Sequence, residues 1–141
     1  VIIQTHQPHH YTILFARQHD YLKLYQQEVT LRRDLLYPPY SRLVNIKLSS
    51  ISEQQVEQCA RDVAVFLKHC VTENNRGHID ILGPAPAPLA RLKDRNRWQI
   101  LLKSSRPAIL HDLSVRLLDK QHEICPGNVK LVVDVDPENM M

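Results

Sequence analysis

One stretch of the sequence decides the fold: LVNIKLSSISEQQ, residues 43–55. Val44, Ile46 and Leu48 alternate with polar residues, which predicts a strand with one buried face. Ser52 then caps a helix, and Gln55 three residues later completes a capping box. The apolar residues of that helix recur at the spacing of one buried face: Val56, Cys59, Ala60, Val63, Phe66, Leu67 and Cys70. We expect the helix to end at residues 74–77.

Three further segments alternate in the same way. They are Ile79 with Ile81, Trp98 with Ile100 and Leu102, and residues 129–135. Pro107 opens a second helix before the last strand. The order β-α-β-β-α-β is that of a split βαβ, or ferredoxin-like, fold. We therefore expect an α+β domain in which a four-stranded antiparallel sheet carries both helices on one face.

The N-terminal residues follow another pattern. Residues 1–5 predict a strand, and a short helix is expected over about 9–18. Asp20 is the expected N-cap of a longer helix over about 21–36. The prolines of the YPPY segment at 37–40 stop that helix, because a residue before proline is pushed out of the helical region. We place a domain boundary here, between 1–38 and 39–141, and expect the unpaired first strand to mark a fragment of a longer protein.

Length, charge and composition bound the function. The chain has 141 residues, 43% of them hydrophobic and 23% charged, which suits a globular protein. Eighteen basic and fifteen acidic side chains give a net charge of +3, so the position of the charge matters more than its sum. No apolar run has the ~18 residues of a membrane helix, so we expect no membrane partner. The three cysteines contain no CxxC pair, which favours reduced thiols in a cytoplasmic protein.

Motifs for catalysis or metal binding are weak in this sequence. Three glycines cannot supply a phosphate-binding loop, so we expect neither ATP hydrolysis nor a cofactor in this chain. His6, His9 and His10 could ligate a metal, but a solvated helix start is the preferred interpretation, and no metal site is expected. His122 and Cys125 share one loop, which alone is weak support for a thiol nucleophile.

The informative segment is 82–106. Its first part, LGPAPAPL at residues 82–89, predicts a stiff polyproline II arm. The arm leads to basic residues that give a local charge of +5, larger than that of the whole chain. The candidates for binding DNA or another anion are Arg91, Lys93, Arg97, Lys103 and Arg106, joined by Arg95. Rigidly presented arginines suit anion recognition, although an ordinary solvated hairpin would have the same sequence.

These stretches resemble the C-terminal portion of the primosomal protein N′ (PriA) family of bacterial replication-restart DNA helicases. The matching pieces are IIQT (2–5) with Pro8, YPPY (37–40), LGPAPAPL (82–89), RWQ (97–99) and VDVDP (133–137). The similarity covers nearly the whole chain in consistent order. It implies that residues 1–38 finish the second helicase lobe with its linker helices. Residues 39–141 would then be a C-terminal domain that binds DNA and protein.

The resemblance also implies partners and site residues. Family members are ATP-dependent 3′-to-5′ DNA helicases that recognise abandoned forks and reload the replicative helicase with other primosome proteins. Their C-terminal domain binds branched DNA and, with the adjoining lobe, the acidic tail of single-stranded DNA-binding protein. In that pocket the family uses an Arg and a Gln that match Arg95 and Gln99, whereas Asn96 departs from the aromatic expected beside them. ATP with Mg²⁺ and zinc would belong to the remainder of the helicase chain.

Two other functions stay open. A free-standing ribosome- or RNA-binding domain would have the same fold, but the outer sheet face is predicted to lack the aromatics that stack on RNA bases. A small enzyme would use the loop that holds His122 and Cys125. The preferred hypothesis is a non-catalytic domain of a primosomal helicase that binds forked DNA and single-stranded DNA-binding protein.

Overall fold

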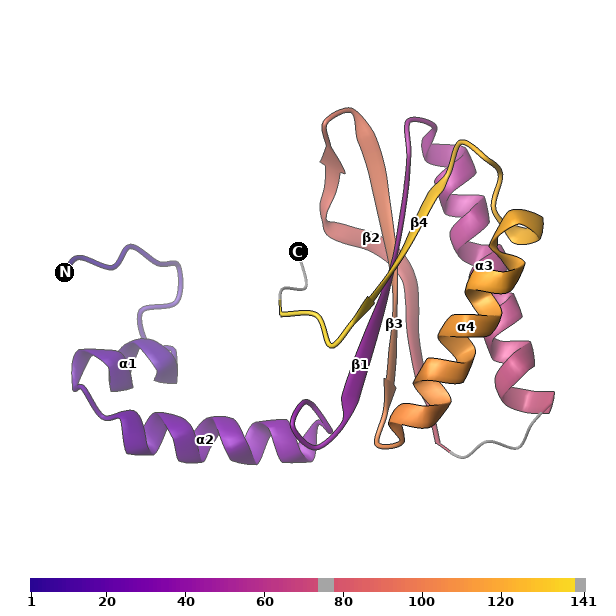
Figure 1. The fold of residues 1–141 in the computed structure, drawn as a ribbon. Helices are drawn as coiled ribbons and strands as arrows, with labels where there is room; N and C mark the ends of the chain where they lie inside the picture. Colours follow the sequence, from indigo (N-terminus) through magenta and orange to yellow (C-terminus); the bar gives the residue numbers. More distant parts are fainter. Residues whose placement is uncertain (74–77, 139–141) are drawn as a thin grey trace. The chain divides into compact units, whose positions relative to one another are not determined.

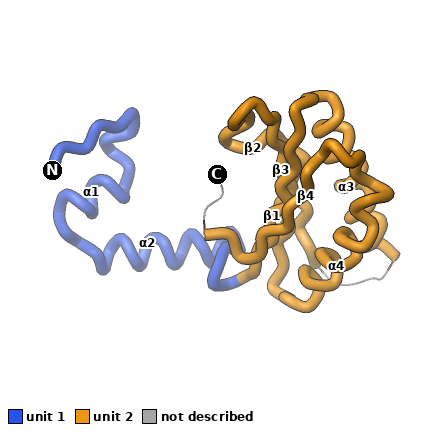
Figure 2. Tube along the Cα trace, turned by 45° about the horizontal axis from the view of Figure 1, so that its top comes forward, with its two compact units in different colours: residues 1–40 blue, residues 41–141 orange. Residues whose placement is uncertain are grey.

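The computed structural model describes residues 1–73 and 78–138. The chain divides into two compact units, residues 1–40 and residues 41–141, which Figure 2 shows in different colours. The helix end predicted at residues 74–77 lies outside the described residues. Within the described ranges, none of the helices has the length and apolar character needed to span a membrane.

The first unit contains two α-helices. They are α1 (Tyr11–Arg17) and α2 (Tyr21–Asp34). Asp20 caps α2 as predicted, because its carboxylate accepts a hydrogen bond from the backbone N–H of Lys23 at 3.1 Å. The Tyr11 hydroxyl donates a hydrogen bond of 2.6 Å to Glu28, which joins α1 to α2 and lowers the pKa of the Glu28 carboxyl. No residue of either helix is buried.

The prediction of a strand at residues 1–5 is wrong. This segment is exposed and forms no strand. A strand is held by hydrogen bonds to a neighbouring strand, and the sheet of the structure has its four strands elsewhere in the described chain. A run of β-branched residues therefore does not form a strand here, because it lacks a partner.

The second unit is a four-stranded antiparallel sheet with two helices on one face, as the sequence predicts (Figure 1). Its elements are β1 (Arg42–Ser50), α3 (Glu53–Glu73), β2 (Asp80–Leu92), β3 (Arg95–Ser104), α4 (Pro107–Ile124) and β4 (Lys130–Val135). The strand order is β2-β3-β1-β4, so each helix connects two strands that have one other strand between them. This is the split βαβ arrangement.

The core lies between the sheet and the two helices. Val44, Ile46 and Leu48 of β1 are at most 1% exposed and pack against α3 and α4. The helix start is fixed by Ser52, whose hydroxyl accepts a hydrogen bond from the backbone N–H of Gln55 at 3.4 Å. The predicted capping box is only half formed, because the Gln55 side chain bonds to Asn128 instead of returning to Ser52.

The opposite side of the sheet, which neither α3 nor α4 covers, is called the outer face below (Figure 1). Successive side chains of a strand point to opposite sides, so the residues that alternate with the core belong to this face. They are Leu43, Asn45, Lys47 and Ser49 of β1, Arg95, Arg97, Gln99, Leu101 and Lys103 of β3, and Lys130, Val132 and Asp134 of β4.

The prolines of residues 82–89 do not form a separate polyproline II arm, so this prediction is wrong. The segment belongs to β2, which pairs antiparallel with β3 and has register shifts between Leu82 and Ala85 and between Pro86 and Arg91. β2 is an outer strand of the sheet, where a proline without an N–H interrupts pairing on one side only. Because polyproline II and β dihedral angles adjoin, the residue pattern alone did not separate the two.

Gly83 makes the first of these register shifts possible. Its φ is +102°, and a Cβ at this position would lie 3.0 Å from the carbonyl oxygen of Gln99. We expect Gly83→Ala to lower the free energy of unfolding by more than about 1 kcal/mol. Gly127→Ala is the matched control, because no atom of the described residues lies within 4 Å of its added Cβ. Urea denaturation of both variants tests this, and equal losses of stability would contradict it.

Candidate functional site

The tip of the β2–β3 hairpin is a two-residue turn. Lys93 and Asp94 have φ angles of 49° and 59°, the left-handed values that a type I′ hairpin turn requires at both central positions. Arg91 lies beside the turn, and its guanidinium is 3.1 Å from the Asp94 carboxylate. Both partners of this ion pair are largely exposed, so it contributes little stability and leaves Arg91 available to a ligand.

Arg95 begins β3 and is anchored within its own domain. Its Nη2 donates a hydrogen bond of 3.0 Å to the backbone carbonyl of Ser49, and its Nε lies 3.4 Å from the Ser49 hydroxyl. A guanidinium has five N–H donors, so the remaining donors of Arg95 stay free for a ligand. The hydrogen bonds to Ser49 hold the Arg95 guanidinium in one orientation, so the side chain loses less conformational entropy when a ligand binds.

The next two residues of the outer face on β3 form rows with β1 and β4. Arg97 pairs in register with Ser49, which pairs with Lys130 on its other side, and Gln99 pairs with Lys47. The side chains of Arg97, Gln99 and Lys130 have no hydrogen-bond or ion-pair partner among residues 1–73 and 78–138. Lys130 is absent from the sequence-predicted site, because only the register of three strands brings it to this row.

The other two basic candidates lie apart from this group. Lys103 is near the far end of β3, where its Nζ is 3.1 Å from the Asp80 carboxylate and its side chain is only 13% exposed. Arg106 precedes α4, beyond the same end of β3. The structure therefore gathers Arg91, Lys93, Arg95, Arg97 and Gln99 at the hairpin end of the sheet and does not bring Lys103 or Arg106 to them.

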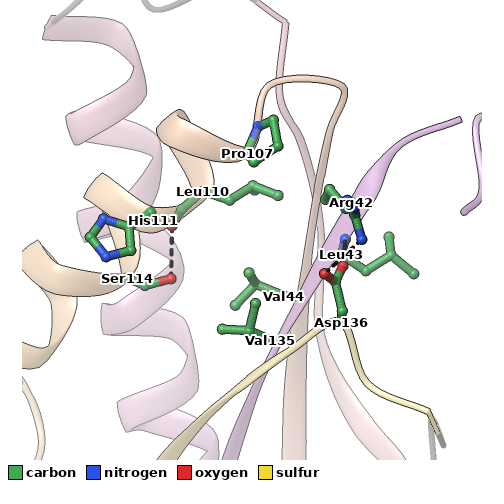
Figure 3. Close-up of a pocket in the computed structure, with 9 residues that line it drawn as sticks. All are labelled: Arg42, Leu43, Val44, Pro107, Leu110, His111, Ser114, Val135 and Asp136. Carbon is green, nitrogen blue, oxygen red and sulfur yellow. Dashed lines mark hydrogen bonds and ion pairs between the residues drawn. The ribbon is translucent and has the colours of Figure 1, made fainter. Parts of the chain in front are cut away.

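A cavity of about 370 Å³ opens on the helix side of the sheet. Figure 3 shows its walls, which come from the start of α4 on one side and from β1 and the end of β4 on the other. The lining residues are Arg42, Leu43, Val44, Pro107, Leu110, His111, Ser114, Val135 and Asp136. An ion pair of 3.1 Å between Arg42 and Asp136 stands at its rim. The cavity is mainly apolar and contains none of the sequence-predicted site residues.

The three cysteines are unbridged thiols that are buried in the core of the second unit. Cys125 follows the last residue of α4 as its C-cap and is 8% exposed, and its thiol shares a hydrogen bond with the thiol of Cys59 on α3. This bond and burial raise the pKa of the Cys59 thiol, whereas the same bond from Cys59 lowers the pKa of the Cys125 thiol. Because Cys125 faces Cys59, the structure does not form the Cys–His pair that an enzyme at His122 and Cys125 would need.

Metal ligands do not gather in the part of the chain that the structure describes. No group of three or more His, Cys, Asp or Glu side chains there could hold a metal ion. On the outer face, Asp134 is instead paired with Lys47 at 2.8 Å. The chemistry available at this face is therefore that of cationic and amide groups, which suits recognition of anions.

Comparison with known proteins shows which chains this one is similar to. The chain is 37% identical to the Replication restart protein PriA of Bacillus subtilis over all of its length, 36% identical to that of Synechocystis sp. over 97%, and 30% identical to that of Treponema pallidum over all of it. It spans only 16–20% of the length of these relatives. Among solved structures, the De novo designed protein Foldit4 has a TM-score of 0.47 and 12% identity over 70% of this chain and 99% of its own.

The family match covers the second unit and only the end of the first unit. Residues 33–138 match the family described as Primosomal protein N C-terminal domain. The match includes β1 to β4 and the candidate residues of the outer face. The chain therefore belongs to the family of primosomal protein N C-terminal domains.

Proposed function

We propose that this chain is the non-catalytic binding part of a replication-restart helicase. It binds forked or branched DNA and the acidic tail of single-stranded DNA-binding protein, and so supports primosome assembly and reloading of the replicative helicase. ATP hydrolysis with Mg²⁺ and zinc binding belong to the remainder of the parent protein, which acts in the cytoplasm with other primosome proteins. The names of the relatives, each a replication restart protein, support this assignment.

The observation that carries the proposal is the unpaired basic row at the hairpin end of the outer face. Arg97 and Lys130 flank Ser49 there without any acidic partner in the described chain. A cation without a partner attracts phosphate or carboxylate without first breaking an ion pair. The hairpin adds Lys93 at its turn and Arg91 beside it, so the positive charge continues from the sheet to the tip.

Gln99 complements this charge with neutral hydrogen bonds. Its carboxamide offers two N–H donors and an acceptor, and it has no partner in the described chain. It lies on the same face as Arg95, with Arg97 between them along β3. An extended peptide along β3 would therefore meet an anchored guanidinium for a carboxylate and an amide for its backbone.

Salt dependence tests the DNA-binding part of the proposal. Arg91, Lys93, Arg97 and Lys130 offer about four phosphate contacts, so log K for a forked duplex should fall with log salt at a slope of about −3 to −4. Arg97→Ala should reduce the magnitude of this slope by about 1. Titrations of a fluorescein-labelled fork from low to high salt measure it by anisotropy.

The matched control is Arg116→Ala. Arg116 is on α4, on the helix side, and its Nε is 2.8 Å from Asp112. Its loss removes the same charge but should leave the slope unchanged. An affinity that does not depend on salt would contradict the proposal, as would strong discrimination between forks of equal structure and different sequence. Tighter binding to RNA of the same structure would favour the RNA-binding alternative.

A further inference from the structure

Asn45 is a polar residue at the centre of the outer face. It belongs to β1, where it pairs in register with Leu101 on β3 and with Asp134 on β4. Although neither helix covers this face, Asn45 is 0% exposed. A completely buried carboxamide on the face away from the hydrophobic core calls for an explanation.

The amide of Asn45 is also unsatisfied. Both its Nδ2 and its Oδ1 are buried and have no hydrogen-bond partner among residues 1–73 and 78–138. Buried amides in folded proteins are nearly always hydrogen-bonded, because an unpaired donor or acceptor keeps the full cost of losing its water. In the domain without a ligand, the donor Nδ2 and the acceptor Oδ1 of Asn45 therefore remain available for hydrogen bonds.

The neighbouring side chains show how a ligand could reach this amide. Lys47 is two residues further along β1, and its Nζ lies 2.8 Å from the carboxylate of Asp134, the register partner of Asn45. The Lys47 side chain thus runs past Asn45 toward β4. This ion pair is partly exposed, so a carboxylate from a ligand can compete with Asp134 for Lys47 at little cost.

Gln99 extends the same polar patch. It pairs in register with Lys47, which makes it a diagonal neighbour of Asn45 across β1 and β3. Its carboxamide is also without a partner in residues 1–73 and 78–138. Two carboxamides without a partner in the described chain are thus diagonal neighbours on adjacent strands, next to a lysine whose carboxylate partner can be exchanged.

We propose that Asn45 is a peptide-binding residue of the outer face, which hydrogen-bonds the main chain of a bound acidic peptide together with Gln99. A carboxylate of the peptide draws Lys47 away from Asp134 and uncovers the Asn45 amide. The amide then donates to a peptide carbonyl and accepts from a peptide N–H. This inference rests on the proposed binding of the acidic tail of single-stranded DNA-binding protein and adds a residue that the sequence did not identify.

The chemistry of the face favours a peptide over a nucleic acid. A carboxamide presents an N–H donor beside its carbonyl acceptor in the spacing of a peptide group, so one peptide group can bond to both Nδ2 and Oδ1. Single-stranded nucleic acids are usually held by aromatic side chains that stack on bases. The described aromatic residues of the second unit, Phe66 and Trp98, both pack against the core.

The test uses Asn45→Leu, which has similar volume and removes both unsatisfied atoms. Binding of a fluorescein-labelled synthetic peptide of the acidic tail should weaken by about 5- to 20-fold, the loss of one to two neutral hydrogen bonds. The melting temperature should equal or exceed that of the wild type, because no bond is lost in the free domain. Affinity for a forked duplex should stay within about twofold. A merely structural role would instead lower the melting temperature.

Asn128→Leu is the matched control. It removes a carboxamide that already bonds to Gln55, outside the outer face, and should leave peptide affinity unchanged. If the wild type binds the peptide and Asn45→Leu binds it equally well, the inference is overturned while the proposed function stands. If the wild type does not bind the peptide, the proposed tail binding itself fails. A loss of fork binding without a loss of peptide binding would overturn the assignment to a peptide.

A second measurement needs no substitution that could prevent folding. In the wild-type chain, the side-chain NH2 resonances of Asn45 and Gln99 are followed by nuclear magnetic resonance while the same unlabelled peptide is added. Both pairs should shift, and their exchange with water should slow as they form hydrogen bonds. Unchanged Asn45 resonances at saturating peptide would overturn the inference.

Discussion

Replacing Arg95 by alanine is expected to weaken binding of the acidic tail peptide by about 10- to 150-fold. A guanidinium that takes a carboxylate in two parallel hydrogen bonds makes the strongest contact available on this face. Arg95 is held for this role by its bonds to Ser49, of which the bond to the backbone carbonyl is 3.0 Å long. Anisotropy titrations of wild type and variant at one fixed salt concentration measure the change.

Arg95→Lys distinguishes the bidentate geometry of the guanidinium from its positive charge. It should lose most of the affinity if the bidentate contact matters, and almost none if Arg95 only adds to a general positive field. Arg116→Ala, which removes an equal charge from the helix side, should bind like the wild type. Because Arg95→Ala also loses the bonds to Ser49, its melting curve must be recorded alongside. Wild-type affinity in Arg95→Ala would show that the assignment is wrong.

Truncating Ile46 to alanine should have the largest effect on folding. Ile46 is 0% exposed at the centre of β1, where it pairs with Ile100 on one side and Val133 on the other. Removing a buried side chain of this size leaves a cavity and costs about 2–5 kcal/mol. In a domain of this size each kcal/mol lowers the melting temperature by about 4–8 °C, so a fall of about 8 °C or more is expected in calorimetry.

Ile51→Ala provides the same chemical change at an exposed position. Ile51 follows β1 directly and is 75% exposed. Its truncation should change the free energy of unfolding by no more than about 0.5 kcal/mol. Similar losses in the two variants would mean that burial in the sheet does not determine the stability of this unit.

The sheet and its helices could be predicted because local patterns agree with the final packing. The alternation in β1 and the helical spacing in α3 describe the faces that are buried in the structure. The proline segment and residues 1–5 could not be assigned in this way. Whether an extended segment becomes a strand depends on a partner strand, and neither sequence pattern contains that information.

The partners of the side chains in the candidate site could not be predicted from the sequence either. Arg97 and Lys103 are both basic and both lie on the outer face, so the sequence treats them alike. Only the register of β2 and β3 places Asp80 beside Lys103 and leaves Arg97 without a partner in the described part of the chain. The unsatisfied amide of Asn45 could not be predicted either, because residue type does not show that a polar residue on the outer face is fully buried. Residue type identified the candidates, and strand register distinguished them.

The two edge strands of the sheet differ in how readily they can pair with a strand of another polypeptide, because β2 contains prolines. Pro84, Pro86 and Pro88 cannot donate a main-chain hydrogen bond, so an incoming strand finds fewer donors in the middle of β2. β4 forms the opposite border and contains no proline between Lys130 and Val135. Aggregation by growth of the sheet is therefore directed to the β4 border. Concentrated preparations of this domain would be protected most directly by charged substitutions there, away from the hairpin that carries the basic residues.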